Sequence, residues 1–429
     1  MSSLRAVFRD YAEAGRAFSL PARLLVVSIF LVWVARGIQG VLFNLYLVEA
    51  GHQAPFVGRA LAMTGAGLAL GALPAGFLAE RWGRRRCLML GLAAEGIGLM
   101  VRALVTDPGA ISALCFLGGA GQSLYMIAAL PFLTEHSGPR ERTHLFSVVF
   151  SAALLAGVVG SAVGGLLPAA LLSLPDALRP GSLGAYRGVL VLGGLVAFSA
   201  SLPLLRLHGL QEASAAQQRE EQPPGSGRLL LPIAFNFLLV GCGAGLVVPF
   251  MNLYFSDRFA CSAAQIGAYF SIASVVTAIA GLAAPVVARR FGTLRTAVAF
   301  ELLSLPFLVT MGAESRLAIA VGAFWLRAML MQAGTPLLQT FVMETLPPGL
   351  RARSTSVNNL LWNLGWAASA GGAGALIARW GYAVPFYLTA ALYATASITF
   401  YLSFRRFPPR AIEPRIGEVA MSLAAQEVN

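Results

Sequence analysis

Long and almost uninterrupted runs of apolar residues follow one another along most of this chain. A run of about 20 apolar residues crosses the hydrocarbon core of a bilayer as a helix, because each helical residue rises about 1.5 Å. The runs are too uniformly apolar for the alternating strands of a membrane barrel. We count twelve, at 22–47, 55–79, 87–105, 109–134, 143–172, 186–205, 229–255, 263–288, 296–313, 316–343, 354–378 and 383–404. The sequence therefore predicts an all-α polytopic membrane protein with twelve transmembrane helices.

The chain also contains two copies of one sequence unit. The string GFLAERWGRRR at 76–86 recurs as PVVARRFGTLR at 285–295, each just after an apolar run. FNLY at 43–46 likewise recurs as MNLY at 251–254. Self-similarity at about half the chain length is typical of parallel repeats in secondary transporters, where each half supplies one bundle. We therefore expect two pseudo-symmetric six-helix bundles.

A polar stretch separates the two copies. It contains QEASAAQQREEQPPGSG, whose composition is typical of a flexible linker. The predicted organisation is an N-terminal segment at 1–21, a bundle at 22–205, a linker at 206–228, a bundle at 229–404 and a tail at 405–429. The N-terminal segment is expected to form either a helix on the membrane surface or a disordered leader. A cleaved signal peptide is not expected, because the apolar run after Arg23 is too long.

Basic residues are concentrated in alternate loops. The formal net charge is +12, and all 31 basic residues are arginine, since the sequence contains no lysine. By the positive-inside rule, this distribution places both termini in the cytoplasm and the protein in the inner membrane. This distribution also indicates that the basic residues interact with the lipid bilayer and not with nucleic acid. Without lysine, a Walker A phosphate loop and Schiff-base catalysis are both excluded.

The residue types that carry metals or catalysis are not clustered. Cys87, Cys115, Cys242 and Cys261 are far apart and lack CxxC spacing, and the four histidines fall in predicted loops or at helix ends. We therefore predict no metal site and no cofactor. A polytopic membrane enzyme remains only a remote alternative, because it would need clustered nucleophiles and bases.

One of the repeated loops carries a recognisable motif, formed by Gly76, Glu80, Arg81, Gly83, Arg84 and Arg85. It resembles the loop between helices 2 and 3 of the major facilitator superfamily, whose pattern is G, three residues, D, R, one residue, G and then basic residues. The twelve predicted helices in two halves resemble the same family over essentially the whole chain. The resemblance implies a transporter that works by alternating access of its two halves.

The motif has a physical meaning at each position. Gly76 would let two helices approach closely, Gly83 would permit a tight turn, and the arginines would anchor the loop in the anionic inner leaflet. By resemblance, the loop is a latch in which Glu80 pairs with a cationic or helix-terminal group, near Arg142 or Ser354. Glu80 stands in place of the usual aspartate, and Arg289 replaces the acid in the second copy. The alternative is that the loop only anchors the topology.

A glycine-rich stretch in the fifth predicted helix partly resembles the family's antiporter motif, GxxxGPxxGG. The matching positions are Ala156, Gly160, Ser161, Gly164 and Gly165. Close helix packing explains them without antiport.

Charged residues inside the membrane need a reason, because each costs about 2.5 to 3.5 kcal/mol at mid-helix on insertion scales. Arg36, Glu95 and Arg327 lie near the middle of predicted helices 1, 3 and 10. By resemblance, helices 1, 4, 7 and 10 line a central cavity. The predicted substrate cavity is formed by Arg36, Gln39, Asn44, Gln122, Tyr125, Asn236, Asn252, Arg327, Gln332, Asn359, Trp362 and Asn363.

The buried charges leave two interpretations open. Arg36 and Arg327, if no carboxylate is near, favour a substrate with a carboxylate, phosphate or sulfonate group, because the guanidinium matches those groups. Alternatively, each arginine caps backbone carbonyls or forms a structural pair. Glu95 is the candidate residue for coupling to protons or another ion, unless it too belongs to a structural pair.

The favoured function is a secondary active transporter that moves a small organic solute by alternating access, with proton-coupled efflux of drug-like or amphipathic compounds. The alternative within this class is a transporter of an organic anion held by Arg36 and Arg327. We expect the protein to work as a monomer.

Overall fold

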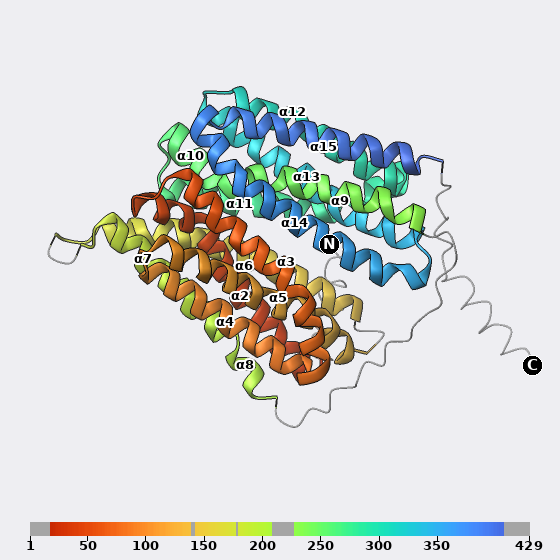
Figure 1. Ribbon diagram of the computed structural model, residues 1–429, viewed down its shortest axis with the longest axis horizontal. Helices are drawn as coiled ribbons and strands as arrows, with labels where there is room; N and C mark the ends of the chain where they lie inside the picture. Colours follow the sequence, from red (N-terminus) through yellow and green to blue (C-terminus); the bar gives the residue numbers. More distant parts are fainter. Residues whose placement is uncertain (1–17, 139–141, 177–178, 208–226, 407–429) are drawn as a thin grey trace, which may run out of the picture.

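A computed structural model describes residues 18–138, 142–176, 179–207 and 227–406, and within these ranges its regular structure is entirely helical. The first half contains α2 (Leu20–Glu49), α3 (Ala54–Trp82), α4 (Arg84–Leu104), α5 (Pro108–Glu135), α6 (Arg142–Leu172), α7 (Ser182–Ser199) and the short α8 (Leu202–Leu205). The second half contains α9 (Gly227–Val247), the 3₁₀ turn η1 (Val248–Phe250), α10 (Met251–Phe259), α11 (Ala263–Phe291), α12 (Thr293–Ala313), α13 (Leu317–Thr345), α14 (Pro348–Trp380) and α15 (Ala383–Phe404). Figure 1 shows the two halves as separate groups of helices.

The helices have the length and composition that a membrane requires. Among the described residues, eleven helical segments are long and apolar enough to cross a bilayer. The twelfth helix, α14, has 33 residues and is long enough, but its asparagines and glycines make it less apolar. The predicted all-α architecture is confirmed. The predicted surface helix or leader at the N-terminus, most of the linker and the C-terminal tail lie outside the described residues.

The seventh predicted helix is interrupted. The predicted membrane span at 229–255 is present as Leu229–Phe259, but it is not one continuous α-helix: α9 ends at Val247, the 3₁₀ turn η1 follows, and α10 begins at Met251. Pro249 lies within the turn, and proline has no backbone N–H with which to continue an α-helix. The sixth predicted helix is divided in the same way, because α7 ends at Ser199 and α8 is a separate short turn that contains Pro203.

The two repeated loops form the same turn. Gly83 joins α3 to α4 with φ 90°, and Gly292 joins α11 to α12 with φ 86°. A side chain is strained at this φ, so glycine is the residue that permits a helix to restart after a single residue. The tight turn expected at Gly83 is therefore present in both copies. We call the end of the molecule that carries these turns the Arg84 end, and the opposite end, which carries the turn at Gly51, the Gly51 end.

The halves meet along two helix pairs, α3 with α14 and α6 with α11, which we call the seam. Small residues bring these helices into contact near the Gly51 end. A Cβ atom added to Gly58 would lie 2.7 Å from the carbonyl oxygen of Ala370, and one added to Gly374 would lie 2.1 Å from that of Ala54. Only glycine allows such close approach of two backbones.

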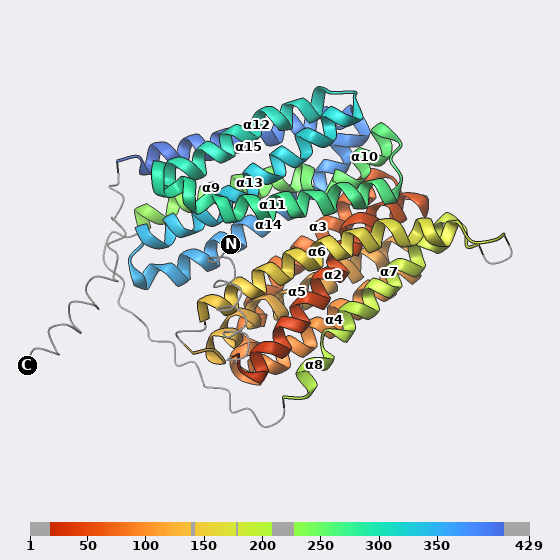
Figure 2. The ribbon, with the colours of Figure 1, turned by 180° about the vertical axis from the view of Figure 1, so that it is seen from behind.

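The seam opens toward the Arg84 end. Along α3, an added Cβ would lie 2.9 Å from α14 at Gly65, but at Gly76 nothing lies within 4 Å. Along α11, it would lie 2.5 Å from α6 at Gly267, and at Gly281 nothing lies within 4 Å. Figures 1 and 2 show the same divergence of the ribbons away from α10. The close helix approach expected at Gly76 is therefore not present, because the halves have separated at this end.

The repeated FNLY and MNLY segments make equivalent contacts. The Tyr46 hydroxyl donates to the carbonyl of Ala103 at 2.8 Å, and the Tyr254 hydroxyl donates to that of Met311 at 2.7 Å. Tyr46 thus joins α2 to the end of α4, and Tyr254 joins α10 to the end of α12. The Tyr382 hydroxyl also donates to the Asp257 carboxylate at 2.6 Å. Each half is therefore bound together at the Gly51 end by its own hydrogen bonds.

Candidate functional site

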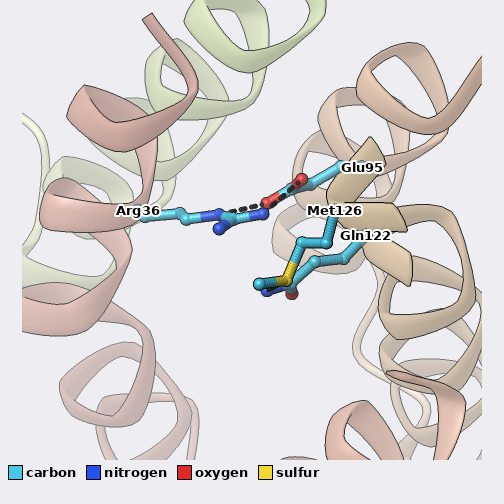
Figure 3. A network of polar contacts seen from close by, with 4 residues as sticks. All are labelled: Arg36, Glu95, Gln122 and Met126. Atoms are coloured by element: carbon cyan, nitrogen blue, oxygen red, sulfur yellow. Dashed lines mark hydrogen bonds and ion pairs between the residues drawn. The ribbon is translucent and has the colours of Figure 1, made fainter. Parts of the chain in front are cut away.

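Arg36 and Glu95 form a buried ion pair in the first half (Figure 3). Arg36 lies in the middle of α2, and its Nε donates to Oε1 of Glu95 at 2.9 Å while Nη2 donates to Oε2 at 3.0 Å. The fork of the guanidinium thus uses both oxygens of the carboxylate, which is the strongest geometry for this pair. The condition for binding a solute anion, that no carboxylate lies near Arg36, is therefore not met, and the alternative of a structural pair describes both Arg36 and Glu95 in this conformation. The two residues are 59 positions apart, and their pairing depends on how α2 packs in the bundle.

Aromatic rings and a thioether surround this ion pair. The Cζ atom of Arg36 lies 5.4 Å from the ring centroids of both Trp33 and Tyr125, within the range of a cation–π interaction. Gln122 of α5 contacts the sulfur of Met126 at 3.7 Å. Tyr125 is buried, whereas Trp33 is 38% and Met126 49% exposed. The ion pair thus lies beside a surface that is apolar, polarisable and accessible.

This surface is turned toward the second half. Arg36, Gly40 and Asn44 follow each other at intervals of four and so lie on one face of α2. Asn44 contacts Asn252 of the second half, and Gly40 is exposed, with nothing within 4 Å of the position of a Cβ. Because the seam opens away from the Asn44 contact, the face around Arg36 borders the space between the halves.

The second half contributes mainly amide and indole groups. Trp362 and Trp366 of α14 stack with ring centroids 5.1 Å apart. Asn359 is exposed, and its carbonyl accepts a hydrogen bond of 2.8 Å from the side chain of Asn363. Gln332 of α13 is also exposed. These four predicted cavity residues of α13 and α14, Gln332, Asn359, Trp362 and Asn363, thus include accessible polar groups, whereas Arg327 of α13 does not belong with them.

Arg327 lies inside the second bundle. It is 6% exposed, its Nε has no hydrogen-bond partner among the described residues, and its guanidinium lies close to the hydroxyl of Tyr393 in α15. The prediction that Arg327 faces the substrate cavity is therefore wrong for this conformation. Periodicity gives the angle of a residue around its helix, but not which neighbouring helix covers that angle.

Three predicted cavity asparagines are buried instead. The side-chain nitrogen of Asn44 donates to Oδ1 of Asn252 at 2.9 Å and to the carbonyl of Pro249 at 2.6 Å, and the nitrogen of Asn252 donates to the carbonyl of Val41 at 3.0 Å. Asn44 and Asn252 thus close the Gly51 end rather than line a cavity. Asn236 donates to the carbonyl of Ala396 at 3.2 Å, inside the second bundle. Buried amides are expected to find such backbone partners.

The interrupted seventh helix makes the contact between the halves possible. In a continuous helix, the carbonyl of Pro249 would accept a hydrogen bond four residues later. In η1 the carbonyl of Pro249 accepts a hydrogen bond from the side-chain amide of Asn44 instead. The break at Pro249 therefore supplies an acceptor from the second half to the first.

The motif loop is tied to the first half. Arg84 forms an ion pair with Glu135 of α5, and Arg85 donates from Nε to the carbonyl of Leu204 in α8 at 2.9 Å. Arg81 is exposed. Glu80 is exposed too, and among the side chains that the structure describes it does not pair with Ser354, which is buried and hydrogen-bonded to Asn358. The alternative partner, Arg142, has a side chain outside the described set.

Two buried charges escaped the prediction of the site. Glu301 of α12 is buried, and its carboxylate accepts a hydrogen bond of 2.6 Å from the Ser397 hydroxyl of α15. Arg102, in the last turn of α4, is 5% exposed and lines a small cavity with Gln39. Both lie about two turns or less from a helix end, where a charge is easily taken for part of the membrane surface. A count of every charge inside a predicted span would have found them.

The described residues contain no group of three or more His, Cys, Asp or Glu side chains that could hold a metal ion. Cys87, Cys115, Cys242 and Cys261 form no disulfide with one another, and three of them are buried.

Comparison with known proteins gives relatives named as an enterobactin exporter and as a multidrug resistance protein. The chain is 26% identical over 371 residues to the enterobactin exporter EntS of Escherichia coli O1:K1 / APEC. This match covers 83% of this chain and 85% of the exporter. For EntS of Shigella flexneri the match is 27% over 272 residues, so the chain spans 61% of that protein's length. The multidrug resistance protein MdtG of Proteus mirabilis is 27% identical over 185 residues, covering 42% of this chain and 45% of MdtG.

The fold is similarly shared with solved transporters. A bacterial homolog of the human lysosomal transporter Spinster, in an inward-facing and unoccupied conformation, superimposes with a TM-score of 0.72 at 15% identity, covering 91% of this chain and 98% of the homolog. At this identity, the likeness shows the fold alone. The predicted architecture of two six-helix bundles is thus confirmed.

A family model covers almost the whole chain. The model described as Major Facilitator Superfamily matches residues 25–370 and, in a second match, residues 233–425. The predicted resemblance is confirmed, and the protein is a multi-pass membrane protein of the Major Facilitator Superfamily.

Proposed function

We propose that the protein is a secondary active exporter of small amphipathic organic solutes, coupled to proton movement. The observation that carries the proposal is the position of the Arg36–Glu95 pair. It lies beside accessible Trp33 and Met126, on the α2 face that borders the space between the halves. Aromatic and thioether groups accept varied apolar ligands, and a charge pair can exchange partners with a polar group of the solute. The names of the EntS and MdtG relatives support export at low identity.

The conformation supports alternating access. The seam is sealed at the Gly51 end by glycine contacts and by Asn44 with Asn252, and it is open at the Arg84 end. The arginines of the repeated loops support a cytoplasmic position for the Arg84 end by the positive-inside rule. With that orientation, both termini are cytoplasmic, the protein lies in the inner membrane, and the structure is inward-facing. We retain 206–228 as the linker between the bundles.

The pairing of Arg36 disfavours the alternative of an organic anion held by Arg36 and Arg327. Glu95 already neutralises Arg36, and Arg327 is buried beside Tyr393. A carboxylate of the solute would have to displace Glu95, leaving a buried charge without a partner. Glu95 remains our candidate for proton coupling, because a proton on this carboxyl would weaken its bonds to Arg36.

Reconstituted protein can test the proposal. Liposomes with an acidic lumen should accumulate ethidium, an amphipathic cation, when the gradient is imposed, and carboxyfluorescein, an anion, should not accumulate. Glu95→Gln should abolish the accumulation, and the matched variant Glu314→Gln, in the exposed turn after α12, should leave it unchanged. Accumulation of the anion alone would support the alternative. Movement of neither probe, with or without the gradient, would contradict efflux of amphipathic solutes.

A further inference from the structure

A buried arginine near the Gly51 end forms no ion pair with any described residue. Arg102 is 5% exposed, and its Nη1 donates to the sulfur of Cys115 at 3.8 Å, while its Cζ lies 4.2 Å from the ring centroid of Phe43. A thiol and an aromatic ring are neutral partners. Arginine stays protonated in proteins, so the positive charge cannot be removed by loss of a proton.

The acidic groups nearby are committed elsewhere. Both oxygens of Glu95 accept from Arg36. Glu49, at the end of α2, accepts the hydroxyl of Ser182, and Asp107 caps the first turn of α5 through the N–H of Ala110. Among the described side chains around Glu95, two guanidinium groups, those of Arg36 and Arg102, thus share this one carboxylate, and the excess charge there is positive.

A cavity lies against this excess charge. It is enclosed by α2, α4 and α7, and Arg102 lines it together with Gln39, Ala35, Leu99, Leu190 and Gly193. Its free space is the size of one water molecule or one monatomic ion. The side-chain amide of Gln39 makes no hydrogen bond to a described residue, so a second polar donor borders the same space. The remaining lining is apolar.

We propose that this cavity binds a small inorganic anion, and that chloride is its ligand. Apart from the bond of Nη1 to Cys115, the guanidinium of Arg102 and the side-chain NH₂ of Gln39 donate to no described residue, and together they fit a monatomic anion. A water molecule would accept hydrogen bonds but would leave the charge of Arg102 uncompensated in a medium of low polarity. Because the free space holds about one water-sized particle, a monatomic anion fits it better than a polyatomic one. The site is distinct from the Arg36–Glu95 surface and does not depend on the proposed transport function.

Thermal unfolding of the purified full-length protein tests the site. Replacing gluconate by chloride at constant ionic strength should raise the unfolding temperature with a saturable dependence on chloride. Gln39→Leu removes one donor and should raise the chloride concentration at half-saturation about tenfold, as expected for loss of one hydrogen bond to a charged group. Arg102→Gln should abolish the chloride effect. The matched variant Arg258→Gln, an exposed arginine at the same end of the second half, should keep it.

Crystallographic location of bromide gives an independent measurement. Soaked bromide should produce an anomalous peak between Arg102 and Gln39, and the peak should be absent from Gln39→Leu crystals. Equal unfolding temperatures in chloride and gluconate would overturn the proposal. So would bromide peaks confined to the protein surface, or a chloride effect that persists undiminished in Gln39→Leu. Because Gln39→Leu adds no charge and removes none, it keeps the test valid even where Arg102→Gln fails to fold.

Discussion

Asn44 and Asn252 lie 208 positions apart in the chain, and their side chains are hydrogen-bonded at 2.9 Å across the two halves. They occupy equivalent places in the two copies of the repeat, so the contact lies on the pseudo-symmetry axis. Each asparagine also donates to a backbone carbonyl of the opposite half. The closure of the Gly51 end therefore depends on one pair of amides in addition to the glycine contacts.

Replacement of one asparagine should favour opening of the Gly51 end. Asn252→Leu leaves Asn44 without its side-chain acceptor in a buried place, at a cost of about 1 to 3 kcal/mol to the closed state. About 1.4 kcal/mol changes the ratio of two states tenfold. Spin labels at Gln53 and Ser315, exposed at this end of each half, should report a larger population of long distances.

Two further variants control this measurement. The double variant Asn44→Leu/Asn252→Leu removes both partners and should lie closer to the unmodified protein than either single variant. Asn236→Leu removes a buried amide bond within one half and should not change the distance distribution. Identical distributions for Asn252→Leu and the unmodified protein would show that the glycines alone close this end.

The Arg36–Glu95 pair should contribute strongly to stability. Its side chains are 16% and 7% exposed, so removal of one partner leaves a charge with little access to water. Arg36→Gln and Glu95→Gln should each lower the free energy of unfolding by about 3 to 5 kcal/mol, and the double variant by less than their sum. Equilibrium unfolding in mild detergent would measure this coupling. Arg84→Gln and Glu135→Gln, which break a more exposed pair, should lower the free energy of unfolding less. If the losses of the two single variants at Arg36 and Glu95 simply add up in the double variant, the two residues are not coupled.

A side chain at Gly76 should be tolerated in this conformation, in which the Arg84 end is open, but should prevent the conformation in which the Arg84 end is closed. Gly58 and Gly65 of α3 contact Ala370 and Ala367 of the antiparallel α14. Continued along both helices, this pairing brings Gly76 against the start of α14 once the Arg84 end closes. Gly76→Leu should therefore leave the unfolding temperature unchanged and abolish transport. Gly188→Leu, at an exposed glycine of α7 with no atoms nearby, is the matched control, and full transport by Gly76→Leu would refute this interpretation of the motif.

The two copies of the loop should differ in importance. Glu80→Gln should impair transport more than Arg289→Gln, because only the first copy has an acid that can pair across the seam when the Arg84 end closes. Initial rates of solute uptake, corrected for the amount of protein inserted, compare the two variants. If both variants lose the same fraction of the uptake rate, or if neither loses any, the loop acts only as a membrane anchor.

An added methyl group at Gly374 should act in the opposite sense to one at Gly76. The new Cβ of Gly374→Ala would lie 2.1 Å from the carbonyl oxygen of Ala54, and backbone atoms cannot yield as a flexible side chain does. The Gly51 end should then fail to close. A thiol reagent should reach a cysteine placed at Ala62, which lies beside Gly371 of α14, faster in this variant than in the parent. Unchanged labelling would mean that the helices of the seam adjust by sliding.

The helices could be predicted because each one crosses an apolar medium by itself, and the length of its apolar run fixes its bounds. The break at Pro249 could not, since proline is common in membrane helices and often only bends them. Pro74, Pro131 and Pro336 all lie inside continuous helices of this structure. A sequence pattern alone does not distinguish these prolines from Pro249.

The site was predicted less well than the fold. The repeat placed Asn44 and Asn252 in equivalent positions, but a polar face of a helix can line a cavity or seal a contact, and periodicity does not separate the two. Arg36 and Glu95 were both recognised as buried charges. Their pairing depends on the rotation of two helices against each other, which arises from packing over the whole bundle.

Because α14 is long, a small rotation about one of its ends moves the other end over a large distance. Ser354 and Gly374 are separated by about 20 helical residues, or roughly 30 Å. The helix would rotate about the point where Gly374 contacts Ala54. A rotation of roughly 20°, no larger than the ordinary tilt of a membrane helix, would move the Ser354 end by roughly 10 Å. A rotation about the contact of Gly374 with Ala54 would therefore open, at the other end of the same helix, an aperture about as wide as a small organic molecule.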